Sequence, residues 1–167
     1  MSVAIARVEP STNDFLDTAE KALISVETLY AQARANVRAE VSTDGKISAS
    51  AFEKAQHVAH GVAWLATYVE ALREMLAYDR RMQDEGRYGE VEDLLTRIGF
   101  GEYLAQTFGG IPMNQGEFIR LTELGLTRSE TAGLHDLVLA ERGNTAAARR
   151  RLVELIADGN FGNSGLD

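Results

Sequence analysis

Apolar residues recur at helical spacing along most of the chain, in stretches bounded by capping and turn residues. The first stretch follows a run of side-chain oxygens at 11–14, which can cap a helix N-terminus, and it predicts a helix over residues 12–40. Its apolar positions are Phe15, Leu16, Ala19, Leu23, Val26, Tyr30 and Ala33. We expect a turn at 42–46, in which Gly45 supplies the positive φ angle.

A second, longer stretch predicts a helix over residues 50–84. Ser50 and Glu53 have the spacing of a capping box, so the helix is expected to begin at Ser50. Its apolar positions form a broad stripe: Phe52, Ala55, Ala59, Val62, Ala66 and Val69, widened by Trp64, Leu65, Leu72 and Leu76. Such a helix is typical of the centre of a bundle, so Trp64 is expected to be largely buried. Gly86 is placed to end the helix.

A third helix is predicted over about 88–107. Gly99 and Gly101 within it would allow close backbone approach. The side chains expected to point inward are Val91, Leu94, Leu95, Ile98 and Leu104. The strongest break in the chain follows at 108–113, where two glycines precede Ile111 and Pro112.

Three shorter helices are predicted beyond this break, near 114–124, 128–141 and 144–158. Thr127 and Glu130 form a second capping box, and Asn144 is the expected cap of the last helix. No alternating pattern predicts a strand. The predicted fold class is therefore all-α, an up-down helical bundle over residues 1–158 with shorter C-terminal helices and no sheet. Residues 159–167, rich in glycine and asparagine, are interpreted as an exit linker.

Composition narrows the class of protein. The 167 residues suit one domain, and 45% apolar with 25% charged residues is the ordinary balance of a globular protein. The net charge of −8 argues against nucleic acid as a partner. No apolar run reaches the roughly 18 residues of a membrane span. Because the chain has no cysteine and its first ten residues lack the features of a signal peptide, we expect a cytoplasmic protein.

Three side chains on the second predicted helix could share a face and hold a metal ion: Glu53, His57 and His60. Di-metal helical bundles, however, carry a glutamate three residues before the histidine. No glutamate precedes either histidine at that spacing, and His135 lies far along the chain. We interpret these residues as a polar edge and expect no metal site.

Other charged residues offer no catalytic pattern. Glu90, Glu92, Asp93 and Glu102 lie at helix-surface spacing, and the signatures of a nucleophile elbow, a phosphate loop or a dinucleotide site are absent. The densest positive run is 149–151, three consecutive arginines. It could bind a phosphate or an acidic partner, or it could be a solvated helix face. No catalytic residue is assigned.

A short motif, Gln106-Thr107-Phe108-Gly109-Gly110, resembles the C-terminal bundle of the acyl-CoA dehydrogenases. In that family a glutamine and paired glycines meet the flavin dinucleotide of a neighbouring subunit. The resemblance implies that Gln106, Gly109 and Gly110 are the positions where a flavin contact could be mapped. The alternative is that the two glycines simply end a helix.

Longer blocks at 60–73, 98–106, 109–117 and 143–149 resemble the N-terminal helical extension of the (2S)-methylsuccinyl-CoA dehydrogenases, within the same family. Residues 161–167 resemble the point at which the flavoenzyme core begins. The resemblance implies an FAD-dependent acyl-CoA dehydrogenase as parent or partner. In that family a glutamate removes the substrate α-proton and a hydride passes to flavin N5. The regions that carry this chemistry are not matched, so no cofactor is expected in this chain.

Two function classes follow from the resemblance. The first is a non-catalytic interaction or scaffold domain that packs on an acyl-CoA dehydrogenase core or associates with itself. The alternative is an independent binder of acyl-CoA or flavin, anchored by the arginines at 149–151 or by Gln106. A docking patch is expected around the glycine-rich break, at Ile111, Met113, Phe118 and Ile119. These four side chains could instead turn inward and cap the bundle.

Overall fold

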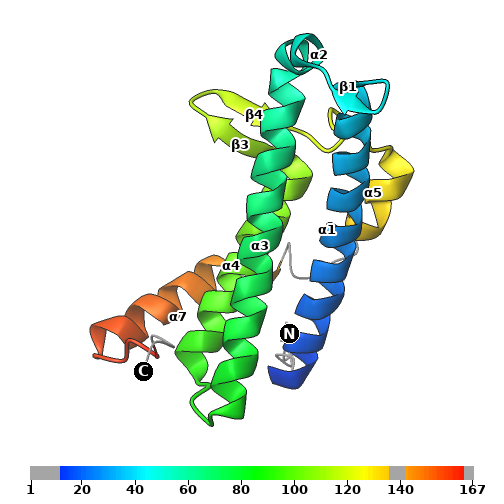
Figure 1. Ribbon diagram of the computed structural model, residues 1–167. Coiled ribbons are helices and arrows are strands. Elements are labelled where there is room, and N and C mark those ends of the chain that lie inside the picture. The colour runs from blue at the N-terminus through cyan, green and yellow to red at the C-terminus, as the bar shows by residue number, and fades with distance from the viewer. Residues whose placement is uncertain (1–11, 136–141, 164–167) are drawn as a thin grey trace, which may run out of the picture.

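Two long helices form the axis of the molecule. The structure, a computed structural model, describes residues 12–135 and 142–163. Helices α1 (Thr12–Glu40) and α3 (Gln56–Asp84) lie side by side and run in opposite directions, and α4 (Glu90–Gly109) packs against α3 (Figure 1). The shorter helices are α2 (Ala49–Lys54), α5 (Arg128–His135) and α7 (Ala146–Ala157). The predicted helical fold class and the helix over 12–40 are confirmed.

The core lies between α1, α3 and α4. Phe15 of α1 meets Phe100 of α4 edge-on, with the ring centroids 6.4 Å apart, and both side chains are buried. Gly99 and Gly101 permit the close packing of α4, as predicted. A Cβ atom at Gly99 would lie 2.4 Å from the Met75 sulfur, and one at Gly101 would lie 2.4 Å from the backbone nitrogen of Asn144.

Two short hairpins contradict the prediction that no sheet forms. Strand β1 (Ser42–Thr43) pairs with β2 (Lys46–Ile47), and β3 (Ile111–Asn114) pairs with β4 (Glu117–Ile119). The first hairpin turns through Asp44 and Gly45, whose φ angles of 51° and 75° suit a two-residue hairpin turn. The predicted turn at Gly45 is therefore confirmed within a hairpin.

The second hairpin also replaces the helix predicted over 114–124, which is wrong. Pro112 cannot donate a backbone hydrogen bond, and Gly110 and Gly116 have φ angles of 132° and 78°, which a helix does not tolerate. Side chains alternate along β3, with Ile111 and Met113 buried. Four residues are too few for this alternation to stand out in the sequence.

The helix predicted over 50–84 is interrupted at Ala55, whose φ and ψ of −104° and 20° separate α2 from α3. The N-cap is Ser48, whose hydroxyl accepts from the Ala51 amide, so the box predicted from Ser50 is wrong. Two burial predictions also fail, because Phe52 and Leu95 are each 46% exposed. Trp64 is partly buried and packs against the core.

Helix ends were predicted more reliably. Gly86, at a φ of 66°, ends α3 as expected, and the Arg87 amide donates to the Met82 carbonyl at 2.7 Å. The capping box of α5 is confirmed, because the Thr127 hydroxyl accepts from the Glu130 amide at 3.3 Å and the Glu130 carboxylate accepts from the Thr127 amide at 2.7 Å. The end of the helix predicted over 128–141 lies outside the described residues.

Helix α7 confirms the helix predicted over 144–158 apart from its cap. The capping hydroxyl belongs to Thr145, which accepts from the Ala148 amide at 3.1 Å. The side chain of Asn144 bonds instead to Glu102 and Arg149. Seen in Figure 1, α7 projects from the lower part of the bundle, where it packs against α4.

Candidate functional site

Gln106, the first residue of the motif that resembles a flavin contact, lies in a chain of hydrogen-bonded polar side chains that joins three helices. Its side-chain oxygen accepts from the Tyr68 hydroxyl of α3, and its amide nitrogen donates to the Glu102 carboxylate at 2.6 Å. Burial is the main cause that raises the pKa of Tyr68, so this phenol stays a donor. Both ends of the Gln106 amide therefore have partners within the chain.

The Glu102 carboxylate links these hydrogen-bonded side chains to α7. Its second oxygen accepts from the Asn144 side chain and, at 3.3 Å, from the Arg149 guanidinium. Arg149 also donates to the Asn144 side-chain oxygen at 2.5 Å. This is the point at which Gly101 leaves room for the Asn144 backbone. The arrangement ties the start of α7 to α4.

The two glycines of the motif differ in their surroundings. Gly109 is the last residue of α4, and a Cβ atom there would meet no atom within 4 Å. Gly110 has a φ of 132° and lies beside the Phe118 ring, which a Cβ atom would approach to 3.0 Å. The backbone of Gly110 donates to the Gln106 carbonyl at 2.8 Å and closes the helix. This geometry is that of a helix end leading into β3.

The four residues expected to form a docking patch are not together on the surface. Ile111, Met113 and Ile119 are buried, with Ile119 packed closely on Gly61 of α3. Phe118 is 43% exposed, and the guanidinium of Arg120 lies 4.3 Å from the centre of its ring. The hairpin therefore presents one of the four side chains to a partner and uses the others to close the bundle.

Two histidines and two of the three consecutive arginines also have partners within the chain. His57 lies 3.5 Å from Glu123, and the ring nitrogen of His60 accepts from the Trp64 indole at 2.9 Å. The Arg151 guanidinium donates hydrogen bonds to both carboxylate oxygens of Glu90, at 2.7 and 2.8 Å. Within residues 12–135 and 142–163, no cluster of three or more histidine or acidic side chains is arranged to hold a metal ion.

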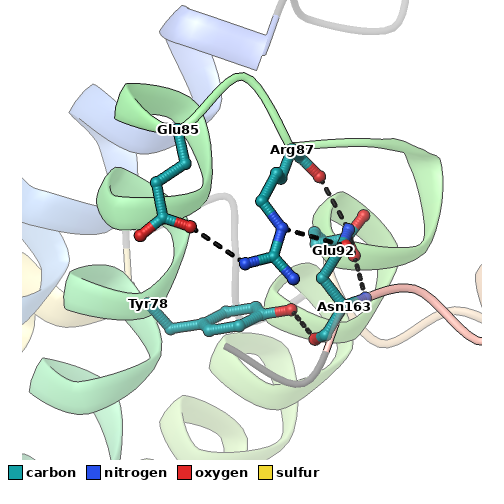
Figure 2. Close-up of polar contacts among 5 residues, drawn as sticks. All are labelled: Tyr78, Glu85, Arg87, Glu92 and Asn163. Atoms are coloured by element: carbon teal, nitrogen blue, oxygen red, sulfur yellow. Dashed lines mark hydrogen bonds and ion pairs between the residues drawn. The ribbon is translucent and has the colours of Figure 1, made fainter. Parts of the chain in front are cut away.

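A polar cluster that sequence patterns did not predict forms around Asn163, at the base of the expected exit linker (Figure 2). The Asn163 backbone and side-chain nitrogens both donate to one oxygen of Glu92, at 2.7 and 2.9 Å. Its carbonyl accepts from the Tyr78 hydroxyl at 2.5 Å, and its amide nitrogen donates to the Arg87 carbonyl at 2.8 Å. Asn163 is thereby fixed on the α3–α4 turn.

Glu92 is the buried centre of that cluster. Its other oxygen accepts from the Gly89 amide at 2.9 Å, at the start of α4. Burial alone would raise the pKa of Glu92, but hydrogen bonds from its own backbone and from Asn163 and Gly89 lower the pKa overall. One sequence feature points to this role: Glu92 stands three residues after Gly89, which is the spacing of the acid in a capping box.

A second buried acid, Asp79 of α3, lies next to this cluster. One of its oxygens accepts from the Thr96 hydroxyl of α4 at 2.9 Å, and the other has no hydrogen-bond partner. Burial raises the pKa of Asp79 to about 7, and the nearby Asp93 and Glu92 carboxylates add to the effect. No sequence pattern marks this residue, because an acid within an apolar helix is usually exposed.

A shallow open pocket of about 170 Å³ lies between the second hairpin and α5. Its lining includes Phe108 and Leu121 beside the side chains of Arg120, Arg128 and two threonines. Sites for drug-sized ligands and cofactors usually occupy about 300–1,000 Å³. The pocket is therefore small for a dinucleotide or a coenzyme A thioester. None of the described helices is long and apolar enough to cross a membrane.

Comparison with known proteins supports the resemblance seen in the sequence. No protein-family model matches the chain. The chain is 47% identical over 163 residues to (2S)-methylsuccinyl-CoA dehydrogenase of Cereibacter sphaeroides. The similarity to this dehydrogenase is confirmed. The match takes in 95% of the chain but 30% of the relative, so the chain spans less than a third of the protein that it resembles.

Proposed function

We propose that the chain is a non-catalytic helical interaction domain, acting within or beside a flavoenzyme of the acyl-CoA dehydrogenase type. The observation that carries this proposal is the match of nearly the whole chain to less than a third of (2S)-methylsuccinyl-CoA dehydrogenase. A segment that aligns from end to end with part of a larger enzyme is most simply one structural unit of such an enzyme. The flavin and the reacting groups would then belong to the remainder of that enzyme.

The internal pairing of the polar side chains supports a scaffold role. Gln106 and Glu102 connect α3, α4 and α7, and Glu92 connects the α3–α4 turn to Asn163. Groups that bind a substrate are usually held ready with a hydrogen-bonding position open toward the ligand. These groups instead fix the relative positions of helices, which is what an interaction domain requires.

The competing function, an independent binder of acyl-CoA or flavin, has weaker support. Gln106 would have to exchange both of its present partners for the ligand, and the arginines at 149 and 151 would have to leave Glu102 and Glu90. The pocket beside α5 is also small for these ligands. Like the scaffold, such a binder would be cytoplasmic, as the absence of cysteine favours.

Three forms of the Cereibacter sphaeroides relative test the proposal: the full-length enzyme, a deletion of the matched segment, and a chimera with this chain in its place. We expect the deletion to lower the melting temperature or alter the oligomeric state, and the chimera to restore both. Sedimentation and thermal unfolding measure these properties, and acyl-CoA oxidation reports on the active site. A deletion form identical to the full-length enzyme in all three measurements would overturn the scaffold role.

A further inference from the structure

Helix α7 carries apolar side chains on two opposite faces. Ala148, Leu152 and Leu155 share the face that is turned toward the rest of the chain, and Leu155 is buried. On the far side, Ala146, Arg150, Val153 and Ala157 are spaced so that they form one exposed line. Val153 is 65% exposed, and Ile156 beside this line is 42% exposed. A helix that contacts a single neighbour normally keeps its outer face polar.

The segment after α7 adds a third exposed apolar group in a fixed position. Phe161 is 73% exposed, although the chain on both sides of it is held by hydrogen bonds. The Asn160 amide donates to the Leu155 carbonyl at 2.9 Å, and Asn163 is bound to Glu92 and Tyr78. Gly162 makes the bend, with a φ of 69° and no room for a Cβ atom beside Val91. The aromatic ring is thus presented on an anchored segment.

Charge on α7 indicates the kind of partner. Arg149 and Arg151 are paired with Glu102 and Glu90, whereas no hydrogen bond or ion pair joins Arg150 to another residue in the described ranges. Arg150 stands in the exposed line between Ala146 and Val153. The complementary surface would be an apolar depression with a carboxylate at its edge. A two-fold pairing of two copies would instead bring two Arg150 side chains into one interface and add positive charge there, which electrostatic complementarity disfavours.

We infer that Val153, Ile156 and Phe161, together with Arg150, form the surface of this chain that docks on the flavoenzyme core. This inference rests on the proposed function and names the contact that it requires. Most of the length of the relative lies outside the matched segment, so an enzyme of that kind has a large core beside the matched segment that could cover these side chains. We call these four residues the α7 surface. It is proposed instead of the docking patch expected at the second hairpin, because Ile111, Met113 and Ile119 of that patch are buried within the chain.

Site-specific cysteine labelling tests the inference, because the chain has no cysteine of its own. Val153→Cys and Phe161→Cys are made in the isolated chain and in the chimeric enzyme, with Ile24→Cys on α1 as the control, since Ile24 is 55% exposed. Maleimide modification is followed at each position by peptide mass spectrometry. Positions 153 and 161 should react at least about tenfold more slowly in the chimera than in the isolated chain, because docking removes them from solvent. Position 24 should react equally in both.

Charge substitutions provide the second measurement. Val153→Asp combined with Ile156→Asp should lower the melting temperature of the chimera, or separate its domains, and should leave the isolated chain unchanged. Ile24→Asp and Ile47→Asp, at residues 55% and 67% exposed, are the matched controls and should leave both proteins unchanged.

The outcomes separate the two proposals. A chimera that assembles normally, yet labels freely at 153 and 161, overturns the α7 surface and leaves the scaffold role standing. Labelling of the isolated chain that slows with its own concentration overturns the surface in favour of a second copy. A deletion form as stable and active as the full-length enzyme overturns both proposals.

Discussion

Asp79 should make the stability of the fold depend on pH in a direction opposite to that of most carboxylates. In the unfolded chain this side chain has an ordinary aspartate pKa of about 3.9. In the folded chain it is fully buried, with one oxygen bonded to Thr96 and the other without a partner, and the pKa rises to about 7. Between these two values the native state holds a proton that the unfolded state releases. Stability is therefore lost as the pH rises through this window.

The magnitude follows from the size of the shift. Each unit of pKa difference corresponds to about 1.4 kcal/mol, so a rise of about three units corresponds to about 4 kcal/mol of stability lost between pH 4 and 8. At pH 7 the native Asp79 is about half-ionised, so the loss is complete only near pH 8. Glu92, whose pKa is lowered, has the opposite sign: its contribution is lost as the pH falls below about 4.5, outside the main window of Asp79.

Asp79→Asn tests this reasoning, because an amide keeps the shape and the acceptor for Thr96 but cannot ionise. Urea unfolding followed by circular dichroism at pH 5, 6, 7 and 8 gives the free energy of unfolding. The wild type should lose about 2 kcal/mol from pH 5 to 7, and the variant should lose little and exceed the wild type at pH 8. Asp17→Asn, at an exposed position on α1, should retain the wild-type slope. A wild-type profile that is flat over this range, or an Asp79→Asn profile with the same slope, would refute the assignment.

Three further predictions concern packing and ligands. Gly101→Ala should destabilise the fold by about 1–3 kcal/mol in urea unfolding, because the new Cβ atom would meet the backbone of Asn144. Gly109→Ala is the control: its Cβ atom faces open space, so stability should change by less than about 0.5 kcal/mol. Trp64→Ala should lower the free energy of unfolding by about 1–3 kcal/mol, because this side chain is partly buried. Removal of a fully buried aromatic side chain costs roughly 3–5 kcal/mol, so a loss in that range would contradict the partial burial. The purified chain should carry no stoichiometric flavin or metal and should not oxidise acyl-CoA with an artificial electron acceptor. A stoichiometric flavin spectrum that disappears in Gln106→Ala would contradict the scaffold role.

The helices were predictable because their signals are local. The periodicity of α1, the φ requirement at Gly86 and the capping box at Thr127 each depend on residues within a few turns of one another. The two hairpins were missed because their strands have two to four residues, too few to show a period of two. The break at Ala55 was missed for a related reason, since an alanine carries no local signal for ending a helix.

The candidate site was less predictable, because pairing between distant residues decided it. Gln106 and the glycines were found through a motif, but nothing in that motif shows that Tyr68 and Glu102 occupy both ends of the Gln106 amide. Asn163 lies 71 residues from its partner Glu92 in the chain, within a segment whose composition is typical of a linker. Composition predicts whether a segment can form a core, and it does not detect a few hydrogen bonds that fix such a segment in place.

For helix α7 the sequence does not determine which face packs inward, and tertiary contacts do. Its wheel has two apolar faces, one through Leu152 and Leu155 and one through Val153 and Ile156, and either could have packed inward. Contacts at the start of the helix determine which face packs inward. There Gly101 leaves space for the Asn144 backbone, and Glu102 accepts hydrogen bonds from Asn144 and Arg149. Once that end is fixed against α4, Leu155 must point inward and Val153 outward, because successive residues are about 100° apart. The arginine run drew attention to this helix for its charge. Its more informative feature is the apolar face that the fold leaves exposed.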